Sequence, residues 1–319
     1  MSNNSSSLHI TEARNSSRLS SVAWKTADYA SYAAVGGTVV CENMIAFAVL
    51  LSNRSLLRQS SLVAGIMLGN LLLGLDLLIS GLYRVVDTTH HQQRPSLRKC
   101  VAVVFPLLYP AAYATEGAFL FLGGLERFLA VAKPTWFRNN WTPKNLWYLS
   151  ATASLLAVLF PITGLVSSWF SHPIIPLAWS CAIPSLYPIE FLIFLTSFSS
   201  LTGALSAFLT ALALFLGIRR FRKLTGAVST DAKSLNRQLQ LTKSMATMSL
   251  IDLVFVALPQ FISFLTGLGV SFPSFIQPWN NNYTQAANAS AAFFACLAFN
   301  SKFRKAFVKF FVSSSWLTN

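Results

Sequence analysis

Seven apolar runs, each about as long as a membrane span, follow one another along the chain with polar loops between them. A helix needs roughly 20 apolar residues to cross about 30 Å of hydrocarbon. Within each run the apolar residues occupy all faces of a helix, whereas the strands of a membrane barrel alternate apolar and polar residues. The pattern predicts an all-α membrane protein that folds as a seven-transmembrane helix bundle. The expected spans are residues 28–52, 60–83, 101–125, 145–169, 187–217, 243–267 and 278–300.

Composition and charge add an orientation to this bundle. Of the 319 residues, 54% are hydrophobic and only 11% are charged, which is more apolar surface than a soluble core of this size can bury. Most of the 24 lysines and arginines fall in loops that face the cytoplasm if the N-terminus is extracellular, as the positive-inside rule requires. The net charge of +14 is therefore interpreted as a topology signal and not as nucleic-acid binding. We expect a multi-pass protein of the plasma membrane.

The N-terminal tail has its own signals. It lacks an apolar core segment, so no cleavable signal peptide is expected and the first span would serve as an uncleaved signal. Three Asn-x-Ser triplets, at Asn3, Asn4 and Asn15, are candidate glycosylation sites. The expected divisions of the chain are a disordered extracellular tail (1–27), a seven-transmembrane domain (28–300), an amphipathic helix on the membrane surface (301–312) and a short cytoplasmic tail (313–319).

The segment after the last span mixes aromatic and basic residues. Such a pattern is typical of a helix that lies in the membrane interface, with its apolar face in lipid and its basic side chains at the headgroups. The side chains expected to face lipid are Phe303, Phe307, Phe310 and Phe311.

Two of the four cysteines are placed where a disulfide can form. Cys100 lies at the extracellular start of the third run and Cys181 lies in the second extracellular loop, both in an oxidising compartment. Cys41 and Cys296 fall inside apolar runs, where a thiol behaves as a small apolar group. We expect a Cys100–Cys181 disulfide.

Several residues have the spacing of landmark positions in a known superfamily. They are Asn43 in the first run, Asn70 in the second, Glu126-Arg127-Phe128 at the end of the third, Pro259 in the sixth and Asn300 to Arg304 after the seventh. This arrangement resembles the rhodopsin-like (class A) G-protein-coupled receptors over residues 28–312. The resemblance implies a seven-helix receptor with a short eighth helix.

Other positions depart from that superfamily. The seventh-helix Asn-Pro-x-x-Tyr motif is replaced by Ala292 to Cys296, and Ala257 stands where a tryptophan usually precedes the sixth-helix proline. The segment from Gly124 to Pro134 is similar to chemoreceptor-type and prostanoid-receptor-like members, and Trp179-Ser180-Cys181 faintly resembles the prostanoid outer loop. The sequence therefore resembles a divergent member.

The acid–arginine pair carries the function that the resemblance implies. Glu126 would hold Arg127 in the resting state, and outward movement of the sixth helix would expose Arg127 to a heterotrimeric G protein. A sixth-helix acid that often latches this arginine is replaced by Leu239, so a loosely held resting state is expected. The alternative is an interfacial ion pair that only sets the depth of the helix.

Ionisable groups inside apolar runs mark a second candidate site. The four acids there have no lysine or arginine at similar depth: Glu42, Asp76, Glu116 and Asp252. By the resemblance, Asn43, Asn70 and Glu116 form the polar core, in which Glu116 would supply the carboxylate of a sodium site that the family usually draws from the second helix. A hard cation prefers such oxygen ligands. The alternative is a protonated Glu116 that is hydrogen-bonded to Asn70.

The resemblance also implies a ligand pocket in the outer third of the bundle. Tyr109 stands where amine receptors carry an aspartate, so an amine ligand is disfavoured. Basic residues near the mouth, among them Arg84, favour a carboxylate-bearing ligand or simply reach lipid headgroups. The expected lining residues are Tyr109, Tyr113, Gln260, Phe261, Phe264, Asn281 and Asn282.

Three functions remain open from the sequence. The first is a receptor that transduces an extracellular small molecule, lipid or peptide to a heterotrimeric G protein, with membrane lipids around it and a sodium ion as the one cofactor considered. The second is a receptor-like protein that does not signal, because of the replaced motifs. A seven-helix transporter is the third, although no internal repeat is visible. No enzyme is expected, because all four histidines lie in the tail or the outer loops, away from the buried acids.

Overall fold

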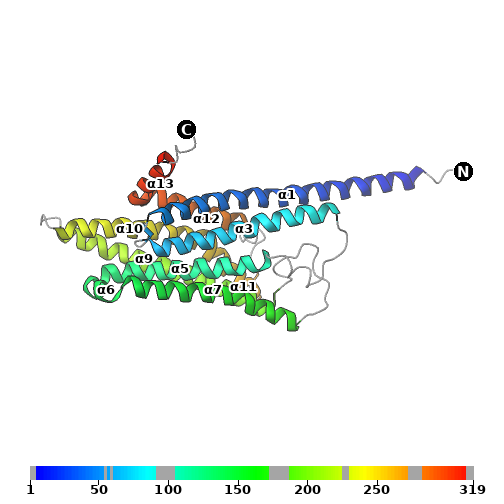
Figure 1. Ribbon diagram of the computed structural model, residues 1–319. Coiled ribbons are helices and arrows are strands. Elements are labelled where there is room, and N and C mark those ends of the chain that lie inside the picture. Colours follow the sequence, from blue (N-terminus) through cyan, green and yellow to red (C-terminus); the bar gives the residue numbers. More distant parts are fainter. Residues whose placement is uncertain are drawn as a thin grey trace.

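The computed structural model describes residues 5–53, 56–57, 60–90, 105–171, 187–224, 230–271 and 282–313. All regular secondary structure in these residues is helical, and a helix lies on each of the seven apolar runs (Figure 1). The long helices are α1 (Ser5–Ser52), α3 (Ser61–His90), α5 (Phe105–Ala132), α7 (Pro143–Ser171), α9 (Ile189–Leu224), α10 (Thr230–Asp252) and α12 (Asn282–Phe299). The shorter elements are α6 (Pro134–Asn140), η1 (Leu253–Ala257), α11 (Leu258–Gly267) and α13 (Ser301–Ser313).

The predicted all-helical class is confirmed, and several helices are apolar enough to span a membrane. Within the described residues the stretches that meet this criterion are Trp24–Ser52, Ser61–Asp87, Lys144–Val166, Ile189–Arg222 and Gln238–Thr266. Two of the seven expected spans, on α5 and α12, are absent from this group. The physical reason is that α5 carries Glu116 and two tyrosines, while α12 carries Gln285 and Asn288. These two helices place polar side chains against the bundle and not against lipid.

The first helix differs from the expected start of the domain. The tail was expected to be disordered up to residue 27, whereas α1 begins at Ser5 and continues without a break into the first apolar run. The polar tail contains few helix-breaking residues, with no proline or glycine before residue 36. Helix can therefore propagate outward from the apolar run.

Helices α1 and α3 pack closely because small residues face each other. A Cβ added at Gly36 of α1 would lie 2.8 Å from the carbonyl oxygen of Gly74 on α3, and one at Gly81 would lie 2.8 Å from the carbonyl oxygen of Tyr29. Membrane helices associate through such small-residue contacts, because lipid offers no hydrophobic driving force between them.

A proline in α5 leaves a carbonyl that another segment satisfies. Pro110 lacks the N–H that would donate to the carbonyl of Pro106 four residues earlier. The Tyr187 hydroxyl donates to that carbonyl instead, at 2.7 Å. This bond ties the start of α5 to the segment before α9.

The sixth apolar run contains a π-helical turn. η1 joins α10 to α11 without a break, and the flanking residues Asp252 and Leu258 keep helical backbone angles. The turn includes Phe255, whose carbonyl would accept from Pro259 in a regular helix if proline had an N–H. A single π turn often marks a functional site or a bend.

The junction of α12 and α13 is fixed by side chains at both helix ends. The Asn300 side-chain oxygen accepts from the backbone N–H of Phe303 at 3.1 Å, as an N-cap does. The Arg304 guanidinium donates to the carbonyl oxygens of Leu297 and Ala298 at 3.4 and 3.2 Å, in the last turn of α12. The chain therefore turns sharply at Asn300.

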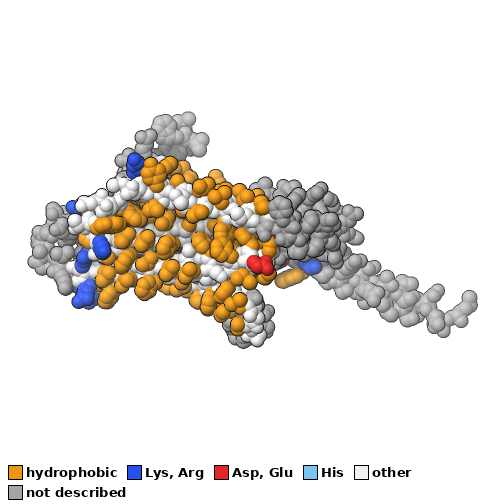
Figure 2. Space-filling model, turned by 90° about the horizontal axis from the view of Figure 1, so that it is seen from below, with side chains coloured by type: hydrophobic (Ala, Val, Ile, Leu, Met, Phe, Trp, Pro, Cys, Tyr) orange, Lys and Arg blue, Asp and Glu red, His pale blue; other side chains and the backbone are white. Residues whose placement is uncertain are grey.

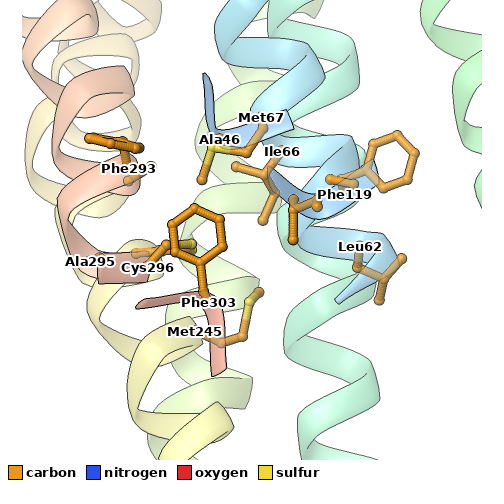
Figure 3. Packing of buried hydrophobic residues seen from close by; sticks show 14 of the residues in the cluster. Ala46, Leu62, Ile66, Met67, Phe119, Met245, Phe293, Ala295, Cys296 and Phe303 are labelled. Atoms are coloured by element: carbon orange, nitrogen blue, oxygen red, sulfur yellow. The ribbon is translucent and has the colours of Figure 1, made fainter. Parts of the chain in front are cut away.

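This turn packs α13 against α1 and α12, which corrects one expectation. Phe303 has 0% of its surface exposed and belongs to a buried cluster with Cys296 and Met245, as Figure 3 shows. Phe307 and Phe310 pack against the same cluster, and only Phe311, 48% exposed, faces outward. Sequence periodicity missed this, because the corner at Asn300 decides which face of α13 meets the bundle.

The molecular surface is apolar along the bundle and basic at one end (Figure 2). Leu155, Leu156 and Val158 of α7 are exposed large hydrophobic residues, which suits lipid better than water. We call the end at which α5, α9 and α12 finish the basic end; lysine and arginine side chains gather there (Figures 1 and 2).

Candidate functional site

The acid–arginine pair lies at the basic end of α5 and has a third partner. Glu126 and Arg127 form an ion pair with 2.7 Å between Oε1 and Nη2. Arg127 Nη1 also donates to the side-chain oxygen of Gln238 on α10 at 3.1 Å. Gln238 precedes Leu239, the position where a latching acid was expected and not found. A neutral amide thus takes the place of the acid. It was not predicted from the sequence, because only the position of Leu239 was considered.

Small cavities surround Arg127. One of about 20 Å³ is lined by Glu126, Arg127, Ser60, Asn300 and residues of α3 and α10, which is room for a water molecule. A second, of about 40 Å³, lies next to it and shares Ser60 and Asn300. The Ser60 hydroxyl is buried and has no hydrogen-bond partner in the described part of the chain. The arginine therefore borders space that opens between α3, α10 and α12.

Glu116, the acid of the expected polar core, has its hydrogen-bond partner on α12. Glu116 is buried in α5, and its Oε1 accepts from the Asn288 side chain of α12 at 2.7 Å. The expected alternative of a bond to Asn70 is wrong, because Asn70 donates to the Ala289 carbonyl at 3.4 Å. Asn70 and Glu116 are still neighbours: a Cβ at Gly69 would lie 2.9 Å from the Glu116 backbone nitrogen.

Two asparagine oxygens in this region have no hydrogen-bond partner among the described residues. Asn43 donates to the Val39 carbonyl of its own helix at 2.9 Å, and its side-chain oxygen is buried and unpaired. The side-chain oxygen of Asn70 is likewise buried and unpaired. An unpaired buried acceptor is costly, by roughly 1–3 kcal/mol. Both oxygens would gain from a donor or a cation.

A second carboxylate approaches the same region. Asp252, buried in the last turn of α10, lies within electrostatic range of Glu116. Its carboxylate occupies the space that a Cβ at Gly203 of α9 would need. Sequence reasoning identified both acids but did not join them, because they lie on helices far apart in the chain.

The chemistry of this cluster is that of oxygen ligands. Two ionised carboxylates without a basic partner would be strongly unfavourable in the bundle. Neutralisation by a proton or by a hard cation such as sodium, which binds carboxylate and amide oxygens, removes that penalty. Among the described residues no group of three His, Cys, Asp or Glu forms a site for a transition metal.

Three of the residues expected to line a ligand pocket contact one another in the half of the bundle away from the basic end. Tyr109 and Tyr113 have ring centroids 4.6 Å apart, and Gln260 donates to the Tyr113 hydroxyl at 3.1 Å. Phe261 stacks on Phe264 but is 46% exposed, so the structure does not bring it together with the tyrosines.

Two polar residues near these tyrosines were not expected as lining. Gln285 of α12 lies within hydrogen-bonding reach of Tyr109, and Asp76 of α3 lies within its electrostatic range. Both are buried, and each has one side-chain oxygen that no described residue hydrogen-bonds. The sequence signal that could have identified Gln285 and Asp76 is a polar residue within an otherwise apolar helix.

Several predicted residues lie outside the part of the chain that the structure describes. They are Cys100, Cys181, Asn3, Asn4 and Asn281, together with the side chains of Asn15 and Asn282. Cys41 and Cys296 are free thiols, the first exposed and the second buried.

No protein-family model matches this chain, and no curated protein sequence matches it either. Its function has to be inferred from its own geometry.

Proposed function

We propose that this protein is a seven-helix plasma-membrane receptor of the rhodopsin-like (class A) kind. It would transduce an extracellular small molecule, lipid or peptide to a heterotrimeric G protein. The observation that carries this proposal is the double attachment of Arg127, to Glu126 in its own helix and to Gln238 on α10, beside cavities at the basic end.

The attachment to Gln238 supplies a switch. A hydrogen bond to a charged group contributes roughly 1.5–3 kcal/mol, an amount that a ligand with a modest preference for one state can overcome. Movement of α10 away from α5 breaks this bond and opens the small cavities into a crevice. Arg127 then presents its guanidinium to a segment of the G protein, which is the order of events in the family that the sequence resembles.

The π turn supplies a place for that movement. η1 separates α10, which carries Gln238, from α11, which carries Gln260 near Tyr113. A ligand that displaces Gln260 acts on one side of the turn, and Gln238 responds on the other. Pro259 weakens the helical hydrogen bonding next to the turn, so bending there is less costly than elsewhere in the helix.

In this proposal the basic end faces the cytoplasm and the N-terminus is extracellular, in agreement with the positive-inside rule. All seven long helices then span the membrane, including α5 and α12, whose polar side chains Glu116, Gln285 and Asn288 are buried in the bundle. The Cys100–Cys181 disulfide and the glycosylation of Asn3, Asn4 and Asn15 belong to the extracellular side.

The test is a cell assay with sensors for several G-protein classes and a panel of candidate ligands. Arg127→Ala is expected to abolish activation while surface expression and ligand binding persist. Arg138→Ala, which removes an exposed arginine of α6, serves as the control and should retain activation. Unchanged signalling from a well-expressed Arg127→Ala variant would contradict the proposal.

A receptor-like protein that does not signal is the second candidate. The segment that replaces the Asn-Pro-x-x-Tyr motif favours it, because Ala292, Phe293 and Cys296 are packed in the buried cluster that holds α13. A rigid anchor there would oppose rearrangement of α12. Ligand binding without a response from any G-protein sensor would support this alternative.

A further inference from the structure

A cavity of about 260 Å³ lies between the ends of α5 and α9, separate from the cavities around Arg127. Its lining combines apolar and cationic side chains: Val131, Ala132, Leu216, Arg219 and Arg220. This volume is slightly below the roughly 300–1,000 Å³ of pockets that hold whole drug-sized ligands. It suits a headgroup-sized molecule.

One of the two arginines is held in position. Arg220 donates through Nη1 to the carbonyl oxygen of Val131, in the last turn of α5. That carbonyl has no donor within α5, because a helix leaves its last four carbonyls unpaired. A guanidinium has five N–H donors. Arg220 is therefore oriented by one bond and keeps further donors for a ligand.

No carboxylate in the described part of the chain neutralises the two arginines. Arg219 and Arg220 form no ion pair with a carboxylate in the described part of the chain, where the Glu126–Arg127 pair is the ion pair observed. Two positive charges at one cavity attract an anion. Guanidinium groups bind phosphate oxygens with paired, well-directed hydrogen bonds, so phosphate fits this site better than a single halide ion.

The surface beside the cavity is apolar and faces outward. Phe215 is 62% exposed and Ile218 is 38% exposed, and both lie on α9 within one turn of Arg219. Figure 2 shows that basic side chains gather where the apolar surface ends. When the phosphate of a ligand contacts the arginines, the rest of the ligand therefore lies against Leu216 and Phe215. A phospholipid has that division, whereas a free phosphate compound does not.

We propose that this cavity is a specific site for the phosphate headgroup of an anionic phospholipid. Arg219 and Arg220 bind the phosphate, and Leu216 with the exposed Phe215 contacts the glycerol and the upper acyl chain. Because Arg220 of α9 also bonds to α5, the bound lipid connects these two helices. This site is independent of ligand transduction and would exist in a non-signalling protein as well.

The test uses the full-length chain in detergent micelles and a short-chain phosphatidylinositol phosphate as probe, with phosphatidylcholine as reference lipid. Bound lipid is counted by native mass spectrometry over a concentration series. The variants are Arg219→Gln alone and Arg219→Gln with Arg220→Gln. Lys305→Gln with Lys309→Gln on α13 is the matched control, since it removes the same charge from exposed positions.

If Arg219 contacts the bound phosphate, its contribution is about 1 kcal/mol, the size that one basic residue adds to anionic-lipid binding, which is roughly fivefold in affinity. We expect Arg219→Gln to weaken binding about fivefold and the double variant by more than tenfold, while the α13 control stays within twofold. Arg219→Gln leaves the contact between Arg220 and Val131 intact, so its result does not depend on the stability of the double variant. An equal loss in the α13 control, or no loss in Arg219→Gln, would overturn the proposal.

A competition arm separates the two sources of phosphate. Inositol phosphate without acyl chains is added to the lipid-bound protein. Weak competition, at least tenfold poorer than the lipid itself, is expected if the apolar surface takes part. Competition as strong as that of the lipid would show a site for soluble phosphates and would overturn the lipid assignment.

Discussion

Arg127 of α5 donates a hydrogen bond to the side-chain oxygen of Gln238 on α10, at 3.1 Å, while its ion pair with Glu126 stays within α5. Of these two contacts, only the bond to Gln238 crosses between helices. It is therefore the contact that changes if α10 moves and α5 does not.

Removal of this bond is expected to raise basal signalling. In Gln238→Leu the amide is lost and Arg127 retains Glu126 alone, so the resting state loses roughly 1.5–3 kcal/mol of stabilisation. In Gln238→Glu an ion pair forms with Arg127, and basal signalling should fall below that of wild type. The measurement is ligand-free activation of G-protein sensors at matched surface expression.

The neighbouring glutamine supplies the control for this series. Gln240 is exposed, and no side-chain hydrogen bond joins it to another described residue. Gln240→Leu should leave basal activity at the wild-type level. Equal basal activity in all three variants would show that the Arg127–Gln238 bond does not hold the resting state.

The polar core gives a second prediction. Glu116→Gln keeps a side-chain oxygen for Asn288 and removes the charge. If a sodium ion neutralises Glu116 and Asp252, sodium should raise the thermal unfolding temperature of purified wild-type protein above that in potassium or choline, and Glu116→Gln should abolish this increase. If a proton and not sodium neutralises the carboxylates, the unfolding temperature should be the same in the three salts, and the Glu116→Gln variant should fold normally.

The bond between Glu116 and Asn288 can be measured by itself. Asn288→Ala leaves a buried carboxyl oxygen without its donor, and a loss of roughly 1–3 kcal/mol is expected. A double-mutant cycle with Glu116→Ala and Asn288→Ala, each of which removes the bond, should give a coupling energy of about 0.5–3 kcal/mol. Asn70→Ala in the same cycle should couple less, because Asn70 bonds to the Ala289 carbonyl. Strong coupling to Asn70 alone would contradict the observed partner.

The sequence predicts local properties of this chain well and contacts between distant segments poorly. The apolar runs predicted the positions of the long helices. They could do so because a membrane-spanning helix is formed by one continuous apolar stretch of sequence. The Glu126–Arg127 pair was visible for the same reason, since its members are adjacent. Gln238, Asn288 and the π turn at Leu253–Ala257 were missed, because each depends on how two helices are set against each other.

Close packing of α1 and α3 gives a test with neighbouring residues of one helix. A Cβ at Gly36 would lie 2.8 Å from the carbonyl oxygen of Gly74, whereas a Cβ at Gly37 meets its nearest atom, on Leu78, at 3.9 Å. Gly36→Ala is expected to destabilise the protein by about 1–3 kcal/mol through overpacking. Gly37→Ala should be neutral or stabilising by up to about 1 kcal/mol, because alanine favours helix. Thermal unfolding in detergent distinguishes the two, and equal effects would contradict the close contact.

The anchoring of α13 gives a fourth prediction. Phe303→Ala empties a fully buried site and should cost about 3–5 kcal/mol, whereas Phe311→Ala removes an exposed ring and should change stability by less than about 0.5 kcal/mol. The measurement is thermal unfolding of the two purified variants. If α13 lay on the membrane surface with both rings in lipid, the two variants would behave alike.

The bond from Tyr187 to Pro106 gives the last prediction. Because Pro110 has no N–H, the Pro106 carbonyl depends on the Tyr187 hydroxyl, and Tyr187→Phe leaves it buried without a donor. The expected loss is roughly 1–3 kcal/mol. Tyr148→Phe, which removes the hydroxyl of an exposed tyrosine on α7, should have little effect. In Tyr187→Phe with Pro110→Ala, the alanine N–H can donate to Pro106, so the double variant should recover stability relative to Tyr187→Phe. Absence of that recovery would show that the hydroxyl does more than replace the donor that Pro110 lacks.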